Sequence, residues 1–528
     1  MIKHNLYRRQ TLRVFFMLAV FMLLSASQGL AQILGERFAG REYRAVWLTT
    51  LSGLDWPSRP VSVPSDTLRQ QQALRQTLDR LQQAGINTVI FQTRIRATVA
   101  YPSNIEPWDG AFSGTPGRGP GYDPLAFALR ECHKRGMELH AWVVAFPICN
   151  AALARRLGAE ALPKKHPELC HRCGDAWFMD PGVPATAQYV AGICREIVER
   201  YDVDGIHLDY IRYPEESVAW KDQATYRKYG NGKRLGDWRR ENVSRVVLEV
   251  HDAVKSVRPW VKLSCSPVGK RADLPRQSSY GWNAREAVYQ DAAQWLQQGL
   301  MDVLFPMMYF DGKHFYPFAQ DWTEQSGGRP VVPGLGIYFL SPREKNWSLS
   351  VIARQMHFAR QLNMGGTAFF RSKFLTDNTK GLYDFLQKDF YRQPVLTPPM
   401  KVSGVAAPEM PHVSIKREGN TLHLSWKAVT SAVPVTYNIY RISKSATSVS
   451  RVSPLTIGAS RPPKDTLVLK KSLEEPRLVA SKISATQWIY TPSLPSLCHD
   501  TYIVRAMDAY GQESGDADGV NVVAIEYK

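Results

Sequence analysis

Residues 203–214, VDGIHLDYIRYP, decide the fold expected for this chain. An apolar-leaning run reaches Asp209 and then breaks, a pattern that predicts a strand delivering polar groups to its carboxyl end. In parallel α/β folds the carboxyl ends of the strands carry the chemistry. His207 and Asp209 lie two residues apart, so both are expected to point into the mouth of a closed barrel. The alternative role for Asp209 is to cap the next helix or to pair with Arg212.

Strands and helices alternate on both sides of this stretch. Strands are expected at residues 43–48, 87–91, 138–144, 203–209, 260–264, 302–309, 331–337 and 366–370, and helices at 69–84, 124–135, 184–201, 238–257, 284–299 and 349–362. Eight nearly uniformly apolar strands, as burial on both faces demands, predict an α/β fold of the parallel (β/α)₈ TIM-barrel type over residues 32–392. A doubly wound sheet is the competing fold, but no glycine-rich nucleotide-binding motif follows any strand.

The composition is that of a globular protein with a large core. Of the 528 residues, 44% are hydrophobic and 11% aromatic, which argues against disorder. The net charge of +18 could attract the chain to an anionic envelope or to polyanionic glycans. The charge is spread along the chain without a dense Lys/Arg block, so nucleic-acid binding is not expected.

Residues 1–31 have the pattern of a secretory signal peptide. Four Lys or Arg residues precede an unbroken apolar run at residues 14–24, and the small residues at 29–31 suit cleavage after Ala31. Loss of this segment would leave a net charge of +14. The run is short for a membrane span. We therefore expect an exported protein, periplasmic or secreted to the cell surface, with no stable membrane insertion.

The seven cysteines leave at least one thiol unpaired. Cys170 and Cys173 form a C-x-x-C motif with His166 and His171 nearby. A second ligand pair is missing, so a small loop disulfide or free thiols are favoured over zinc. No metal and no cofactor is expected.

The chain changes character beyond the barrel. Residues 393–411, rich in Pro, Val and Ala, predict a linker, and residues 412–528 predict a small all-β, immunoglobulin-like sandwich. Its strands are expected at 412–415, 421–426, 436–441 and 501–506, with an extended loop at 442–482. Trp426, Tyr440 and Tyr502 are expected in its core.

Several motifs resemble the glycosyl hydrolase-like 10 family of bacterial exported proteins. The resemblance covers residues 40–390 and rests on REYRAVWLTTLSGLDWP (41–57), GMELHAW (136–142), FMDPG (178–182), VDGIHLDYIRYP (203–214), WRRENV (238–243) and VKLSCSPVG (261–269). The chain from residue 411 resembles a fibronectin type III domain, with DAYGQES (508–514) similar to the last-hairpin signature.

The resemblance implies a TIM-barrel glycoside hydrolase that acts on glycan chains, with relatives connected to bacterial cell-wall glycan. Such relatives often show FDDYFYP where this chain has LDYIRYP. Asp209 keeps the first acidic position, Tyr210 replaces the second, and Arg212 adds a charge.

Glycoside hydrolysis ordinarily uses two carboxyl groups that flank the scissile bond. Asp209 is the first candidate, as nucleophile or stabiliser, kept ionised by Arg212 or His207. The second carboxyl group is left open between Asp311, after the sixth strand, and Glu106, after the second.

Asp55, after the first strand, is a third option for this second carboxyl group. For each of these three, a surface or capping role is the alternative. Flat aromatic rings suit sugar faces, while polar groups bind hydroxyls. The candidate substrate-binding residues are His207, Arg212, Tyr213, Asp55, Trp56, Arg94, Trp108, Asn150 and Tyr309.

These observations predict an exported enzyme that hydrolyses O-glycosidic bonds in a carbohydrate polymer or oligosaccharide. The alternative is a non-catalytic glycan-binding pseudoenzyme of the cell envelope. A barrel metallohydrolase is disfavoured because the first strand ends in Trp47-Leu48-Thr49-Thr50 rather than in His-x-His. A third alternative places the key contact in the sandwich domain, although such modules are more often spacers. The pattern does not predict an oligomeric state.

Overall fold

The computed structural model describes residues 40–215, 220–277, 280–419, 421–443, 476–491, 500–515 and 523–524. The expected signal peptide at residues 1–31 lies outside the described residues. Residues 42–528 belong to one compact unit. Within the described ranges, no helix has the length and apolar character that crossing a membrane requires.

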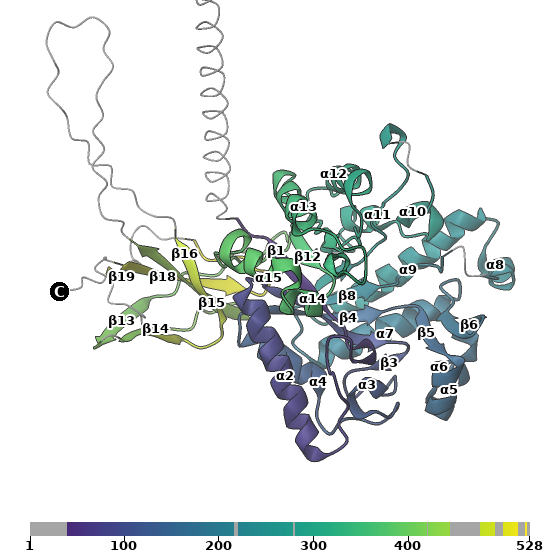
Figure 1. Cartoon of the computed structure of the whole chain (residues 1–528), viewed down its shortest axis with the longest axis horizontal. Helices are drawn as coiled ribbons and strands as arrows, with labels where there is room; N and C mark the ends of the chain where they lie inside the picture. The colour runs from purple at the N-terminus through teal and green to yellow at the C-terminus, as the bar shows by residue number, and fades with distance from the viewer. Residues whose placement is uncertain are drawn as a thin grey trace, which may run out of the picture. The chain divides into compact units, whose positions relative to one another are not determined.

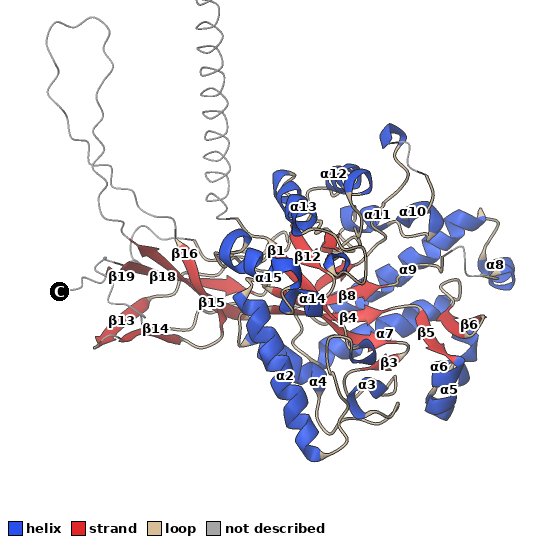
Figure 2. Ribbon diagram, in the orientation of Figure 1, coloured by secondary structure: helices blue, strands red, loops and turns tan. Residues whose placement is uncertain are grey.

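Eight parallel strands follow one another around the sheet in the order β10-β9-β8-β4-β2-β1-β12-β11. Their bounds are β1 (Tyr43–Leu48), β2 (Thr88–Ile95), β4 (Glu138–Val144), β8 (Gly205–Asp209), β9 (Lys262–Cys265), β10 (Val303–Leu304), β11 (Gly334–Leu335) and β12 (Gly366–Phe369). Parallel bridges join Leu304 to Val331 and Met307 to Gly334, so the edge strands meet and the sheet closes. The predicted TIM barrel is confirmed, with its helices outside the strands (Figure 1; Figure 2).

Aromatic rings fill the interior of the barrel. Phe305 makes edge-to-face contacts with Tyr43, Trp47, His140 and His207, at centroid distances between 5.5 and 6.5 Å. Burial of one such large side chain contributes about 1.5–3 kcal/mol to stability. The interior is therefore a packed core and not a pore, and a ligand has room only beyond the ends of the strands.

The longer helices that cover the barrel overlap the predicted ones, except for the helix at Tyr316–Glu324, which the sequence pattern did not predict. The longer ones are α2 (Pro64–Gln83), α4 (Pro124–His133), α7 (Pro184–Arg200), α9 (Leu235–Lys255), α12 (Tyr316–Glu324) and α13 (Leu349–Gln361). Asp123 illustrates the local cause: its side chain accepts a hydrogen bond from the Ala126 amide, while Pro124 occupies the first helical position. Shorter helices are α3 (Gly110–Ser113), α5 (Ala151–Leu157), α6 (Leu162–Lys165), α8 (Gln223–Tyr229), α14 (Ser372–Thr376) and α15 (Leu382–Phe385).

The helix expected at residues 284–299 is wrong in one respect, because the chain breaks it into α10 (Ala284–Ala287) and α11 (Ala292–Gln297). Tyr289 between them has a φ of +61°. The buried Gln290 accepts a hydrogen bond from the Val268 amide. The hydrophobic periodicity did not predict this break, because the side chain of Gln290 makes its hydrogen bonds to residues far away in the sequence.

A small three-stranded antiparallel sheet inserted after β4 carries the C-x-x-C motif. It comprises β5 (Pro147–Asn150), β6 (Cys170–Cys173) and β7 (Ala176–Met179), while a short β3 (Thr98–Val99) pairs with β2. Cys170 and Cys173 are both free thiols. Residues three apart on a strand point to opposite faces, so these two sulfurs do not bond to each other. Among the described residues, no group of three or more His, Cys, Asp or Glu side chains could hold a metal.

The C-terminal part contains two small antiparallel sheets that share one hydrophobic core, consistent with the predicted sandwich. The strands are β13 (Val413–Glu418), β14 (Thr421–Trp426), β15 (Val435–Ser443), β16 (Arg477–Ile483), β17 (Gln487–Tyr490), β18 (Asp500–Asp508) and β19 (Val523–Ala524). Trp426 and Tyr502 lie in the core as expected. The expectation for Tyr440 is wrong: on the pleated strand β15 its neighbour Tyr437 faces the core, and Tyr440 packs against Leu478 on the other face.

Two further segments differ from their expected roles. The end of the expected loop 442–482 forms most of β16, whereas residues 444–475 lie outside the described residues. The expected linker begins as a segment held against the barrel, since the Glu42 amide donates to the carbonyl oxygen of Leu396 (3.1 Å) and the Thr397 hydroxyl donates to Glu138 (2.6 Å).

Candidate active site

Asp209 ends β8 at the carboxyl end of the barrel and is 5% exposed. One carboxylate oxygen accepts hydrogen bonds from the Ser266 hydroxyl (2.7 Å) and from the Tyr210 amide (2.8 Å). The other oxygen accepts from the Trp142 indole N–H (3.0 Å). Groups from the neighbouring strand β4 and from the chain just after β9 therefore fix the carboxyl group in one orientation.

Burial raises the pKa of Asp209, and its three hydrogen bonds and the more distant charge of Arg212 offset only part of that effect. The sequence predicted a lowered pKa for Asp209, because Arg212 or His207 was expected to keep its carboxyl group ionised. Neither side chain contacts the carboxylate among the interactions of the described residues. Asp209 therefore binds its proton more tightly than an exposed aspartate does.

The backbone turns sharply directly after Asp209. Tyr210 has a φ of +49°, a left-handed conformation that is costly for a residue with a bulky side chain. This turn leaves the Tyr210 ring 40% exposed while Ile211 and Tyr213 become buried. Strain of this kind concentrates at functional sites, and here it points the Tyr210 amide at the Asp209 carboxylate.

Tyr309 is a predicted binding residue on which the Asp209 charge acts. Burial and the Asp209 carboxylate together raise the pKa of the Tyr309 hydroxyl. Its half-buried ring packs 5.4 Å from Phe370 and 5.9 Å from Tyr338, centroid to centroid. Tyr309, Tyr338 and Phe370 thus form an aromatic cluster, and the Asp209 charge acts on the Tyr309 hydroxyl of this cluster.

His207 and Tyr213 belong to the same stretch as Asp209 but lie in the core. His207 accepts a hydrogen bond from the Trp47 indole (3.3 Å) and pairs through its other ring nitrogen with Ser264 (3.0 Å). Burial lowers the pKa of His207, so this ring is neutral. The Tyr213 hydroxyl accepts from the Asn242 amide (3.1 Å), and the residue is 1% exposed.

Glu106 and Arg94 form a fully buried ion pair. Two hydrogen bonds of 2.6 and 2.8 Å join the guanidinium to the two carboxylate oxygens. Arg94 also donates to the carbonyl oxygens of Val144 and Ala145, at the end of β4. The Tyr189 hydroxyl adds a bond of 3.2 Å to Glu106. The side chains of Arg94 and Glu106 therefore make their hydrogen bonds within the protein, and they hold the loop after β2 in place.

Asp55 and Trp56 have comparable supporting contacts. Asp55 forms an ion pair with Arg371, which joins the loop after β1 to the loop after β12, and accepts a hydrogen bond from the Thr49 amide (3.0 Å). Burial, only partly offset by Arg371, raises the pKa of Asp55. Trp56 is 2% exposed and donates to the carbonyl oxygen of Gln70 (2.8 Å).

Of the remaining predicted residues, Arg212 is buried, with one terminal nitrogen 3.1 Å from the Glu215 carboxylate, and the other three lie at the surface or are half-buried. Asp311 is exposed, and its carboxylate accepts the Gly312 amide (2.7 Å) at the start of a short 3₁₀ helix, Gly312–His314. Asn150 is exposed and caps α5 by accepting from the Leu153 amide (2.9 Å). Trp108 is half-buried against Gly119.

Two partners of Asp209 were missed as site residues by sequence reasoning. Ser266 comes two residues after the end of the expected fifth strand, and Trp142 two residues before the end of the third, so both lie at the same end of the barrel as Asp209. Trp142 was interpreted as core because it lies inside a strand. The order of the strands in a barrel could have identified both residues, because β4 and β9 lie on either side of β8.

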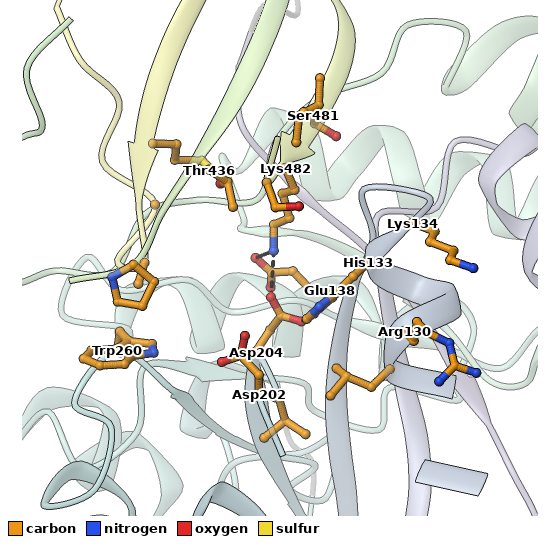
Figure 3. Close-up of a pocket in the computed structure, with 18 of the residues that line it drawn as sticks. Arg130, His133, Lys134, Glu138, Asp202, Asp204, Trp260, Thr436, Ser481 and Lys482 are labelled. Atoms are coloured by element: carbon orange, nitrogen blue, oxygen red, sulfur yellow. Dashed lines mark hydrogen bonds and ion pairs between the residues drawn. The ribbon is translucent and has the colours of Figure 1, made fainter. Parts of the chain in front are cut away.

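A cavity of about 800 Å³ lies at the other end of the barrel (Figure 3). Glu138 and Lys262, the first residues of β4 and β9, line it together with Asp204, which precedes β8. The opposite wall includes Ser481 and Lys482 of β16. TIM-barrel chemistry resides at the carboxyl ends of the strands, so this cavity is not the candidate active site.

Comparisons with known proteins show the family to which the chain belongs. Residues 42–333 match the model of the family described as glycosyl hydrolase-like 10. The chain is 33% identical to the glycosyl hydrolase YngK of Bacillus subtilis (strain 168), over 73% of this chain and 79% of that protein. It is also 33% identical to the glycosyl hydrolase DigH of Escherichia coli (strain K12), over 65% and 86%. Among solved structures, the PgaB (BpsB) glycoside hydrolase domain from Bordetella bronchiseptica is similar, with a TM-score of 0.44, 13% identity and coverage of 66% and 98%.

Proposed function

Because the chain belongs to the glycosyl hydrolase-like 10 family, we propose that it is an exported glycoside hydrolase that cleaves O-glycosidic bonds in a bacterial or environmental glycan. Peptide-free cell-wall glycan is the first substrate to test. The observation that carries the proposal is the buried, triply hydrogen-bonded Asp209 at the carboxyl end of β8. A TIM-barrel glycosidase needs a carboxyl group with a tuned pKa at this end.

The raised pKa of Asp209 favours the role of proton donor over the expected role of nucleophile or stabiliser. A carboxyl group with a raised pKa keeps its proton to a higher pH than an exposed one, and it can then protonate the leaving oxygen. Trp142 and Ser266 would orient the group during the transfer.

Asp311 is the better candidate for the second carboxyl group. Glu106 and Asp55 each pair with an arginine, so their charge is already neutralised. Asp311 is exposed and follows Tyr309 by two residues, in the loop after β10. An exposed carboxylate can act as a base toward water, with Tyr309 stacking on a sugar ring.

The alternative function is a non-catalytic glycan-binding protein of the cell envelope. The observation that favours it is the engagement of two of the three candidate partner carboxylates in ion pairs. If Asp311 is not the partner, Asp209 has no second carboxyl group among the candidates.

The test is product release from a panel of polysaccharides, including peptide-free cell-wall glycan, read by mass spectrometry. The chain is compared with Asp209→Asn, Asp311→Asn and the control Asn150→Ala. We expect fragments from the parent and the control, with rates reduced about 10²–10⁴-fold in both aspartate variants. Glycan binding without fragments from any protein would support the alternative function, and full activity of Asp209→Asn would refute the proposed mechanism.

A further inference from the structure

The cavity of about 800 Å³ at the amino-terminal end of the barrel has walls from two parts of the chain (Figure 3). Residues of α4, of α7 and of the chain before β8 and β9 form the barrel side, and residues of β15, of β16 and of the turn after β18 form the other side. Ligand sites commonly have volumes of about 300–1,000 Å³ and lie between domains. The cavity therefore has the size and the location of a site for a small molecule or a short stretch of a glycan.

Four largely buried charged side chains of the lining pair with one another. Lys482 lies 2.8 Å from Asp204 and 3.2 Å from Glu138. Lys262 lies 2.7 Å from the same oxygen of Glu138, and His133 contacts the second oxygen of Asp204 at 2.8 Å. A charged ligand would have to displace one of these partners, which is costly because a buried charge would be left uncompensated. The buried part of the lining thus favours an uncharged ligand.

The exposed charges of the lining lead to the same conclusion. Three of them have a partner of opposite charge: Lys134 with Glu131, Arg200 with Glu196, and Asp202 with Arg258. Arg130 has no carboxylate partner among the described residues, and its guanidinium lies over the Phe127 ring. A single solvated cation attracts an anion only weakly.

Trp260 presents an aromatic ring to the cavity. Its half-buried side chain packs against the barrel core, and among the described residues its indole N–H has no hydrogen-bond partner. The half-buried hydroxyl groups of Thr436 and Ser481, on the C-terminal sheet, also have none within the described ranges (Figure 3). Aromatic faces suit the apolar faces of sugar rings, and hydroxyl groups bind sugar hydroxyls. The groups still available for binding are therefore those that a neutral sugar needs.

We propose that this cavity is a second, non-catalytic site for a neutral sugar chain, with one sugar ring stacked on Trp260 and its hydroxyl groups bound by Thr436 and Ser481. The barrel separates this site from Asp209, since a seven-residue strand such as β4 is about 20 Å long. A glycan in the cavity would be held and not cleaved. The inference takes only the class of its ligand, a glycan, from the proposed function.

The experiment locates binding by hydrogen exchange read by mass spectrometry, in the full chain with Asp209→Asn so that the probe stays intact. The probes are chitohexaose, which is neutral, and an oligogalacturonate of the same length, which is anionic. We expect chitohexaose to slow exchange in the peptides that contain Trp260 and Ser481. Adding Trp260→Ala should weaken this binding about 10-fold, and Trp260→Phe should retain most of it because a ring remains.

The matched control is Leu248→Ala, which shortens an exposed side chain of α9 outside the cavity lining and should leave the protection unchanged. Thermal melting checks that each variant folds. If Trp260→Ala does not fold, Ser484→Trp takes its place, because it adds a large side chain to the cavity from an exposed position. This variant should also abolish the protection.

No protection around Trp260, the same protection in Trp260→Ala as in its parent, or protection by the anionic probe only would overturn the inference. Protection near Asp209 without protection at the cavity would also overturn it, and would leave the proposed function in place. Protection at the cavity from a chain that releases no fragments from any glycan would support the inference and refute the proposed function.

Discussion

Two buried carboxyl groups at opposite ends of the barrel, Glu138 and Asp209, have pKa values shifted in opposite directions. At the amino-terminal end, burial alone would raise the pKa of Glu138, but Lys262, Lys482 and His140 more than compensate and hold that pKa well below its usual range. At the carboxyl end, Asp209 receives only neutral donors, and its pKa is raised. For these two groups, similar burial gives opposite pKa shifts, because nearby cations outweigh the burial of Glu138 whereas Asp209 contacts only neutral donors.

The amino-terminal network crosses from the barrel to the C-terminal sheets, as the dashed lines in Figure 3 show. Lys482 of β16 lies 2.8 Å from Asp204 and 3.2 Å from Glu138. His133 adds a 2.8 Å contact to Asp204, and burial of that carboxylate is outweighed by these cations, so its pKa is lowered. Cations thus lower the pKa of both carboxylates in this network, whereas Asp209, the proposed proton donor, has only neutral hydrogen-bond donors.

The largest stability effect is expected from Lys482→Met, which removes the cation shared by Asp204 and Glu138. Removing one partner from a buried ion-pair network costs about 3–5 kcal/mol, because charge is left uncompensated. Urea unfolding followed by tryptophan fluorescence measures the loss. Activity per folded molecule should not change, since the site lies at the other end. A loss below about 1 kcal/mol would mean that the network does not neutralise the amino-terminal end.

The contributions of these carboxyl groups to stability should change with pH in opposite directions at the two ends of the barrel. Glu138 and Asp204 have lowered pKa values in the folded state, so the stability they contribute is present above about pH 4 and is lost as the pH falls through their folded pKa values. Asp209 has a raised pKa, so its contribution is present below about pH 4 and is lost as the pH rises through its folded pKa.

Asp209→Asn should therefore have a higher Tm than the parent near pH 7 and the same Tm near pH 3. Each unit by which burial raises the pKa corresponds to about 1.4 kcal/mol. Thermal melting of both proteins across pH 3–8 is the measurement. A lower Tm of Asp209→Asn at pH 7 would show that the ionised carboxylate stabilises the fold, which would remove the contrast between the ends.

A smaller effect is expected from Ser266→Ala. It deletes one donor to Asp209, which raises the pKa of the carboxyl group further and shifts the pH profile of kcat/KM upward. Loss of a hydrogen bond to a charged group is worth about 1.5–3 kcal/mol, or about 10–100-fold in rate. Ser264→Ala, whose hydroxyl contacts His207 instead, is the matched control and should leave the pH profile unchanged.

The fold could be predicted from the sequence because each barrel strand is an apolar run with a polar end. Asp209 was found for the same reason. What could not be predicted was the partner of each polar group: Glu106 faces Arg94, and Asp55 faces Arg371, across 12 and 316 residues of sequence. The direction of the Asp209 pKa was missed because it depends on burial and not on the neighbouring Arg212.

The smallest expected effect concerns Asn150, which sequence reasoning assigned to sugar hydroxyls and the structure gives a role as the N-cap of α5. Asn150→Ala should lower the free energy of unfolding by about 1 kcal/mol, because the Leu153 amide loses its partner. Asn150→Ser should restore most of that loss, since a serine hydroxyl also caps a helix. Neither change should alter KM for the glycan. A higher KM in both variants, at unchanged stability, would show that Asn150 contacts the substrate. The binding site would then reach the small sheet inserted after β4.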